Sequence, residues 1–211
     1  MPTVPPSAPT IAEREPVTKM DGRRTRRDRN HEIVLDTVRK LFAEEMLFPT
    51  VEAVAQRSGV SVRSLYRHFE DPGSLVSAAV QRSMQLGSAR ARIPSFGQGS
   101  FEERLRRFVE VRVTLFEHEG SGFRVARVHA PDLPALRDAL ETTRRFLREQ
   151  VDGQFATELR ALPRRERFFA LSACDTASQF DSLDYLRRDR HVTVAECKEI
   201  LARTFERNLR A

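Results

Sequence analysis

One short segment concentrates side chains that can hydrogen-bond to base edges and phosphates. Its candidate contact residues are Ser61, Val62, Arg63, Ser64, Tyr66, Arg67 and His68. Arginine can donate two hydrogen bonds to guanine, and hydroxyl groups can reach bases or phosphates. Leu65 and Phe69 are four residues apart, so they lie on the opposite, apolar face of a helix. The spacing predicts a short helix that packs through one face and leaves the polar face outside.

The preceding residues predict a second short helix and a tight turn. Thr50 is a good N-cap for the sequence VEAVAQRS, and Ser61 is a good N-cap for the helix that follows. Gly59 lies between them, where the turn requires a left-handed backbone that only glycine adopts at little energetic cost. Two short helices joined in this way form a helix-turn-helix. Its second helix has the dimensions to enter a DNA major groove about 12 Å wide.

A longer helix is expected before this pair. Apolar residues from Val34 to Met46 recur at helical spacing, and Thr25 with Asp28 resembles a capping box. This helix should end before Pro49, because proline disfavours a helical residue in front of it. The stretch GRRTRRDR at 22–29, which includes Arg26 and Arg27, is either a solvated basic run or an arm that contacts phosphates or a minor groove.

The whole region resembles the DNA-binding part of the TetR/AcrR family of transcriptional regulators. The resemblance rests on TVEAVAQRSGVSVRSLYRHFEDPGSLVSAAV and on the preceding VLDTVRKLFAEE, and it covers about residues 24–80. It implies that Thr50 caps its helix and contacts a phosphate. It assigns base-edge contacts to Val62, Arg63 and Ser64, and contacts at the rim of the groove to Tyr66 and His68.

Two departures from the family pattern stand out. Many relatives carry a phosphate-binding lysine near the position of Pro72 or Gly73, whereas this chain has Glu70 and Asp71 and no lysine there. This departure predicts weaker DNA binding at that point, which the arginines of 23–29 could offset. The second departure is Glu45-Met46-Leu47, where many relatives have a glycine turn.

The rest of the chain predicts an all-α protein. Helical spacing runs through 74–92, 101–119, 121–130, 133–162, 164–189 and 193–211, and no period-2 runs predict a sheet. We expect a disordered tail at 1–22, a three-helix DNA-binding domain at 23–73, and a larger ligand-binding and dimerisation domain at 74–211. A helix capped by Ser74 would link the two domains.

Composition narrows the function classes. The formal net charge is +6, and only three of the 36 basic residues are lysines. This balance suits an anionic partner such as nucleic acid, but GC-rich codons are the simpler cause of the arginine bias, so the bias alone decides little. No apolar run is long enough to span a membrane and no signal peptide is recognisable, so we expect a cytoplasmic protein. We predict no enzyme, metal or cofactor, because HExxH, CxxC and GxSxG are absent and the two cysteines suit a core.

A few polar residues interrupt apolar helix faces in the second domain. Arg112 stands where the row containing Phe108 predicts an apolar residue, and a buried unpaired charge is costly. Either it pairs internally with an acid such as Asp175, or it belongs to a cavity for a small-molecule effector. The candidate cavity residues are Phe108, Arg112, Phe116, His129, Asp175 and Gln179.

The last two helices could form a dimer interface. The final helix has one broad apolar face, from Val194 to Leu209, which serves the chain's own core, a homodimer, or both. A two-fold dimer would let two helix-turn-helix units read a palindromic operator. The function predicted is therefore a ligand-responsive, homodimeric DNA-binding regulator, most simply a repressor. The alternative is a dimeric small-molecule or protein-binding module that keeps the helix-turn-helix as a scaffold.

Arg63 gives the sharpest test of base reading. If its guanidinium binds guanine, Arg63→Ala should relax the preference at one base pair per half-site by about 1–3 kcal/mol. Binding-site selection followed by affinity measurements on single-base variants would check this. Uniform weakening on every sequence would instead assign Arg63 to a phosphate.

Overall fold

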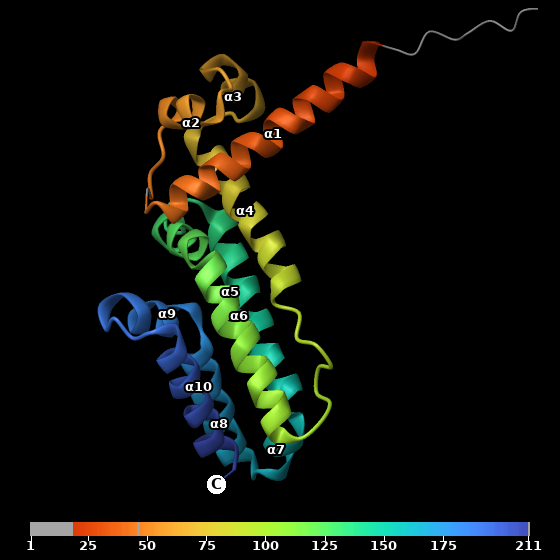
Figure 1. The fold of residues 1–211 in the computed structure, drawn as a ribbon, viewed down its shortest axis with the longest axis vertical. Coiled ribbons are helices and arrows are strands. Elements are labelled where there is room, and N and C mark those ends of the chain that lie inside the picture. The colour runs from red at the N-terminus through yellow and green to blue at the C-terminus, as the bar shows by residue number, and fades with distance from the viewer. Residues whose placement is uncertain (1–18, 46, 211) are drawn as a thin grey trace, which may run out of the picture.

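The computed structural model describes residues 19–45 and 47–210, with side chains from residue 27 onward. These residues form ten α-helices and one π-helical segment. Figure 1 shows their arrangement. Their bounds are α1 Lys19–Ala43, α2 Val51–Ser58, α3 Val62–His68, α4 Pro72–Arg90, α5 Phe101–His129, α6 Pro134–Gln154, α7 Ala156–Ala161, α8 Arg164–Ser178, α9 Phe180–Asp184, η1 Tyr185–Asp189 and α10 Val194–Leu209.

The predicted all-α architecture is confirmed, because the described residues contain helices and no strand. α1, α2 and α3 lie at one end of the elongated molecule, and α5 to α10 form a helical bundle that extends to the other end (Figure 1). α4 packs against both α1 and α5, so it links the two parts as predicted. None of the helices in the described ranges is both long enough and apolar enough to cross a bilayer.

The start of α1 differs from the prediction. The helix begins at Lys19, so residues 19–22, expected in a disordered tail, are helical, and Thr25 lies inside the helix and not at a cap. Once a helix is nucleated by its packed part, each added residue gains a backbone hydrogen bond, so it can extend beyond its buried face. The rest of the expected tail, residues 1–18, lies outside the described residues.

The predicted pair of helices at 101–119 and 121–130 is one continuous helix, α5. The prediction, which ended one element at Glu119 and began the next at Ser121, was wrong because the helix continues through Gly120. Gly122 is a packing position, since a Cβ there would lie 3.0 Å from Ser83 Oγ and 3.1 Å from Ser83 Cβ on α4. The glycine lets the two helices approach closely.

Two helices predicted as continuous are broken in the structure. The segment 133–162 divides into α6 and α7 at the fully buried Phe155, and 164–189 divides into α8, α9 and η1. The break after α8 occurs at Gln179, whose backbone is extended. Phe155 packs on Phe108 of α5 and Phe205 of α10, contacts that local spacing does not reveal.

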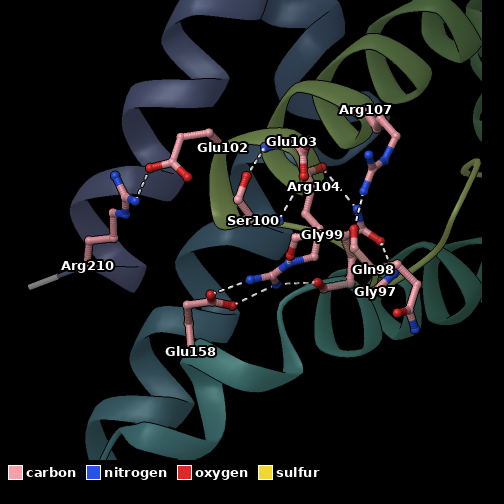
Figure 2. Close-up of polar contacts among 11 residues, drawn as sticks. Gly97, Gln98, Gly99, Ser100, Glu102, Glu103, Arg104, Arg107, Glu158 and Arg210 are labelled. Atoms are coloured by element: carbon pink, nitrogen blue, oxygen red, sulfur yellow. Dashed lines mark hydrogen bonds and ion pairs between the residues drawn. The ribbon is translucent and has the colours of Figure 1, made fainter.

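The bundle end farthest from α1 is held by a polar cluster (Figure 2). Ser100 and Glu103 form a capping box at the start of α5. Arg104 is only 5% exposed and forms a two-armed ion pair with Glu158 of α7, in which Nη1 lies 2.8 Å from Oε2. The same Nη1 donates to the Gln154 carbonyl at 2.8 Å. The cluster therefore fixes α5 against the junction between α6 and α7.

The Arg104–Glu158 pair shifts both pKa values. Burial raises the pKa of Glu158, but hydrogen bonds from Arg104 and the Glu158 backbone amide, together with nearby positive charge, outweigh it, so the pKa is lowered overall. The hydrogen bond to Glu158 raises the pKa of Arg104. A carboxyl group with a lowered folded-state pKa stabilises the fold above its unfolded pKa, and this contribution is lost as the pH falls through the folded value.

We expect Glu158→Gln to lower the free energy of unfolding by about 2–4 kcal/mol at pH 7, because it leaves Arg104 buried without its partner. The matched control is Glu102→Gln, which removes an exposed partner of Arg210 and should change little. Urea denaturation measures both. The loss in Glu158→Gln should shrink as the pH falls below the ordinary glutamate value of 4.5. Equal losses in the two variants would contradict this account.

Candidate nucleic-acid interface and cavity

The helix-turn-helix forms as its caps predict. Thr50 Oγ1 accepts a hydrogen bond from Ala53 N at 3.2 Å, and Ser61 Oγ accepts one from Ser64 N at 3.3 Å. Gly59 has a φ of 70° and donates its N–H to the Ala55 carbonyl at 3.0 Å. These local contacts start and stop α2 and α3 at the predicted places.

α3 is anchored through one face and exposes the other. Leu65 is 1% exposed and Phe69 is 7% exposed, so the apolar face lies in the core. Tyr66 is 52% exposed. The predicted contact residues that are exposed are Ser61, Arg63, Tyr66 and Arg67, and those that are half-buried are Val62, Ser64 and His68. A stiff helix therefore offers donors and acceptors on its outer face.

α1 lies beside the end of α3. His31 stacks on Phe69 with ring centroids 5.3 Å apart and lies 6.0 Å from the His68 ring. Burial, and then the positive charges of Arg27, His31 and Arg67, lower the pKa of His68. Arg27 is exposed, and the side chain of Arg26 lies outside the described residues. The structure thus brings the exposed Arg27 of the basic stretch near the end of the predicted reading helix.

The start of α4 corrects one prediction and explains a departure from the family. The N-cap is Asp71 and not Ser74: Asp71 Oδ1 accepts from Ser74 N at 2.7 Å, and Ser74 Oγ accepts from Asp71 N at 3.2 Å. Pro72 occupies the first turn. Asp71 is therefore explained by helix capping, and the proposed boundary between residues 73 and 74 falls inside the first turn of α4.

The turn after α1 connects this region to the bundle. Glu45 has a φ of 65°, a left-handed conformation that favours glycine, which fits its place at the family's glycine turn. Arg188 of η1 binds both carboxylate oxygens of Glu45, and its hydrogen bond lowers the pKa of Glu45. His129 Nε2 lies 2.9 Å from the Leu47 carbonyl, and Phe48 packs on the His129 ring. His129, predicted in a cavity, instead joins α5 to this turn.

A cavity of about 470 Å³ lies between α4, α5 and α6. Most of its lining is apolar, and its polar groups include Ser83 of α4, Glu119 of α5 and Asp138 of α6. The large apolar residues in its wall are Val80, Met84, Leu115, Phe123, Phe146, Leu147 and Phe180. None of the six predicted cavity residues belongs to this wall.

The predicted cavity residues serve other contacts. Arg112 is 2% exposed and donates to the Ser178 carbonyl at 2.9 Å and the Leu147 carbonyl at 3.1 Å, while its guanidinium lies over the Phe108 ring. Burial lowers the pKa of Arg112 to about 9, against the opposing charge of Asp175. Asp175 itself bonds Arg148 and Gln179, and Phe116 packs on Phe180. Arg112 thus satisfies carbonyls at the end of α8 and inside α6.

The described residues contain no group of three or more His, Cys, Asp or Glu side chains placed to hold a metal ion. Cys174 and Cys197 are both buried and unbonded to each other. Burial raises the pKa of the Cys174 thiol to about 12 and also raises that of Cys197. Both cysteines therefore lie in the core, where burial disfavours ionisation of their thiols.

Comparison with known proteins supports the fold. No protein-family model matches the sequence, and no curated protein is significantly similar to it. Among solved structures, a TetR-family transcriptional regulator from Streptomyces coelicolor matches with a TM-score of 0.69 and 18% identity over 86% of this chain and 80% of that chain. A second, described as a TetR-family transcriptional regulator from Rhodococcus sp., matches with a TM-score of 0.60 and 19% identity over 85% of this chain and 98% of that chain. The chain has the TetR-family fold.

If α3 enters a DNA groove as it does in the TetR-type fold, the carboxylate of Asp71, which caps α4, should repel DNA phosphates. We expect Asp71→Asn to raise DNA affinity by up to about fivefold at low salt, the scale of one charge contact near water. Asparagine caps a helix as well as aspartate, so the melting temperature should stay the same. Fluorescence anisotropy with duplex DNA would measure the change. Glu206→Gln, at the far end of α10, is the control that should have no effect. A gain that persists at high salt would contradict the electrostatic cause.

Proposed function

We propose that this protein is a DNA-binding transcriptional regulator of the TetR type, which acts in the cytoplasm as a homodimer on a palindromic operator. The observation that supports this most directly is α3, which is fixed by Leu65 and Phe69 and leaves Arg63, Tyr66 and Arg67 exposed. Helices of this kind read bases in the major groove with residues of their exposed face. Thr50 and Ser61, at the N-termini of α2 and α3, are proposed phosphate contacts.

We base the proposed dimer on the outer face of α8 and α10. Cys197, Leu201, Phe205 and Leu209 are buried in the chain's own core, so most of the broad apolar face of α10 is used within the subunit. The neighbouring surface exposes Phe168 and Phe169 of α8, at 61% and 51%, and Ile200 of α10 at 40%. Exposed apolar residues on two adjacent helices, two of them aromatic, are suited to burial against a second copy.

The proposed effector site is the cavity between α4, α5 and α6. Its volume and mostly apolar wall fit the properties of small-molecule sites. α4 forms part of the wall and also begins beside α3, so a ligand that prefers one position of α4 would shift the arrangement of the two reading helices in a dimer. Loss of operator binding on such a shift would make the protein a repressor.

Selection of genomic fragments on the purified protein tests this function. We expect the bound fragments to share an inverted repeat whose half-sites lie about one helical turn apart. If a dimer contacts about eight phosphates, the logarithm of the affinity should fall with the logarithm of salt concentration with a slope of about −7. Failure to retain any duplex in dilute buffer would favour the alternative, a binding module that keeps the helix-turn-helix as a scaffold.

A variant of the proposed interface tests the dimer, with light scattering added to the fragment selection. Phe168→Arg should convert the protein to a monomer in light-scattering measurements and abolish selection of the repeat, because it places a charge in the proposed interface. Tyr185→Arg is the matched control: it changes an aromatic side chain of η1 that is 52% exposed and outside α8 and α10. If Phe168→Arg remains dimeric, the interface lies elsewhere.

A further inference from the structure

The charged residues described in the wall of the cavity between α4, α5 and α6 are all acidic, which bears on the charge of a ligand that would fit there. The described lining residues include the carboxylates Glu119 and Asp138 but no lysine, arginine or histidine. An anionic ligand would find no counter-charge in the wall, and burial of an unpaired anion is costly. The wall therefore fits a molecule with an apolar body and a cationic end.

Glu119 is the group best placed to bind that cationic end. It lies on the inner wall, and only 8% of its side chain is exposed. One oxygen accepts a hydrogen bond from Arg90 at 2.7 Å, and the other is 3.5 Å from Arg39, at the outer limit of a hydrogen bond. A carboxylate has about four acceptor sites, so Glu119 can accept further donors. Asp138 of α6 also lines the cavity, is exposed, and adds a second negative charge to the wall.

The same wall contacts the predicted DNA-binding part. A second cavity of about 360 Å³ lies on the other side of Ser83 and Glu119, and Arg39 of α1 lines it. Arg39 Nε donates to Ser83 Oγ at 3.0 Å and Nη2 reaches Glu119 at 3.5 Å. Figure 1 shows α1 crossing α4 at this end of the bundle. Arg39 is thus a polar contact between α1 and two residues that also face the first cavity.

We propose that the cavity binds an apolar molecule with a primary ammonium group, and that this group binds Glu119 in competition with Arg39 and so loosens α1. The proposal rests on the effector site proposed above and specifies its ligand. The Arg39–Glu119 contact is the weaker of the two that Glu119 makes, so it is the one that a better-placed donor displaces. Arg90 keeps its bond to Glu119, and the ammonium group takes the place of Arg39, so the carboxylate still has two cationic partners.

A set of ligands with one tail and three head groups tests the chemical class. Calorimetric titration of the full chain at pH 7 would compare decylammonium, 1-decanol and decanoate, each well below its micelle concentration. Decylammonium should bind at least about tenfold more tightly than decanol, the difference expected of a charge-assisted hydrogen bond, and decanoate should bind most weakly. Decanoate binding as tightly as decylammonium, or no binding of decylammonium, would overturn the proposal.

Two variants locate the head group. Glu119→Gln should reduce decylammonium affinity about tenfold and leave decanol affinity unchanged. Since that variant also affects Arg90 and Arg39, the exposed Thr142 of the cavity wall provides a second test: Thr142→Lys should weaken decylammonium and strengthen decanoate. The control is Glu141→Gln, an exposed α6 residue outside the wall. The assignment would be contradicted if Glu119→Gln lowered the affinities for decylammonium and decanol equally. It would also be contradicted if Thr142→Lys changed neither the decylammonium nor the decanoate affinity.

Hydrogen exchange tests the connection to α1. Saturating decylammonium should speed amide exchange in residues 31–43 of the wild-type protein and have no effect there in Arg39→Met, in which the contact is already absent. Unchanged exchange in the wild type would refute the competition with Arg39. These measurements need no DNA, so they separate the two proposals. If the protein binds an operator but prefers decanoate, only the proposed ligand class is wrong. If decylammonium binds at Glu119 but the protein binds no DNA, only the proposed regulator function is wrong.

Discussion

α4 and α5 cross so closely at Gly122 that a side chain there would force Ser83 to shift. A Cβ on Gly122 would lie within 3.1 Å of Ser83, and Gly87 on α4 faces Glu119 and Leu115. This close crossing places Ser83 beside Glu119 and brings α1 near enough for Arg39 to reach both. The cavity wall, the link between the two parts and the position of α4 all depend on this approach, because α4 is the helix that packs on both α1 and α5.

Buried polar side chains hold the rest of the bundle by satisfying backbone groups. Arg112 donates to carbonyls of α6 and α8, and Gln150 donates to the Ala91 carbonyl at 2.7 Å. Gln154 accepts from Gly97 N at 2.8 Å and donates to the Arg104 carbonyl at 2.9 Å. The partners Ser178, Ala91 and Gly97 lie at a helix end or in a loop, where backbone groups lack helical partners, so these hydrogen bonds satisfy them. Polar residues on apolar helix faces are here structural, and the cavity lies elsewhere.

The region that carries the proposed DNA contacts differs in kind from the bundle. Its elements are set by caps and turns a few residues long, such as Thr50 with Ala53 and Gly59 with Ala55. Of its two departures from the family pattern, Asp71 has a local explanation because it caps α4, whereas Glu45 adopts the left-handed turn with support from the distant Arg188 of η1. A region built from local contacts can move as a unit when α4 moves, without rearranging its own helices.

The sequence alone determined the all-α class, the limits of α2 and α3 and the outward face of α3, because periodicity and capping depend on neighbours in the chain. It misplaced the start of α1, the N-cap of α4, the continuity of α5 and the breaks at Phe155 and Gln179. Tertiary contacts bear on those features: α5 continues through Gly122, where the absence of a side chain leaves room for Ser83 of α4, and the Ser178 carbonyl at the end of α8 accepts a hydrogen bond from Arg112. Only the folded arrangement could place Glu119 and Ser83 between a cavity and Arg39, since these residues are brought together from three helices distant in sequence.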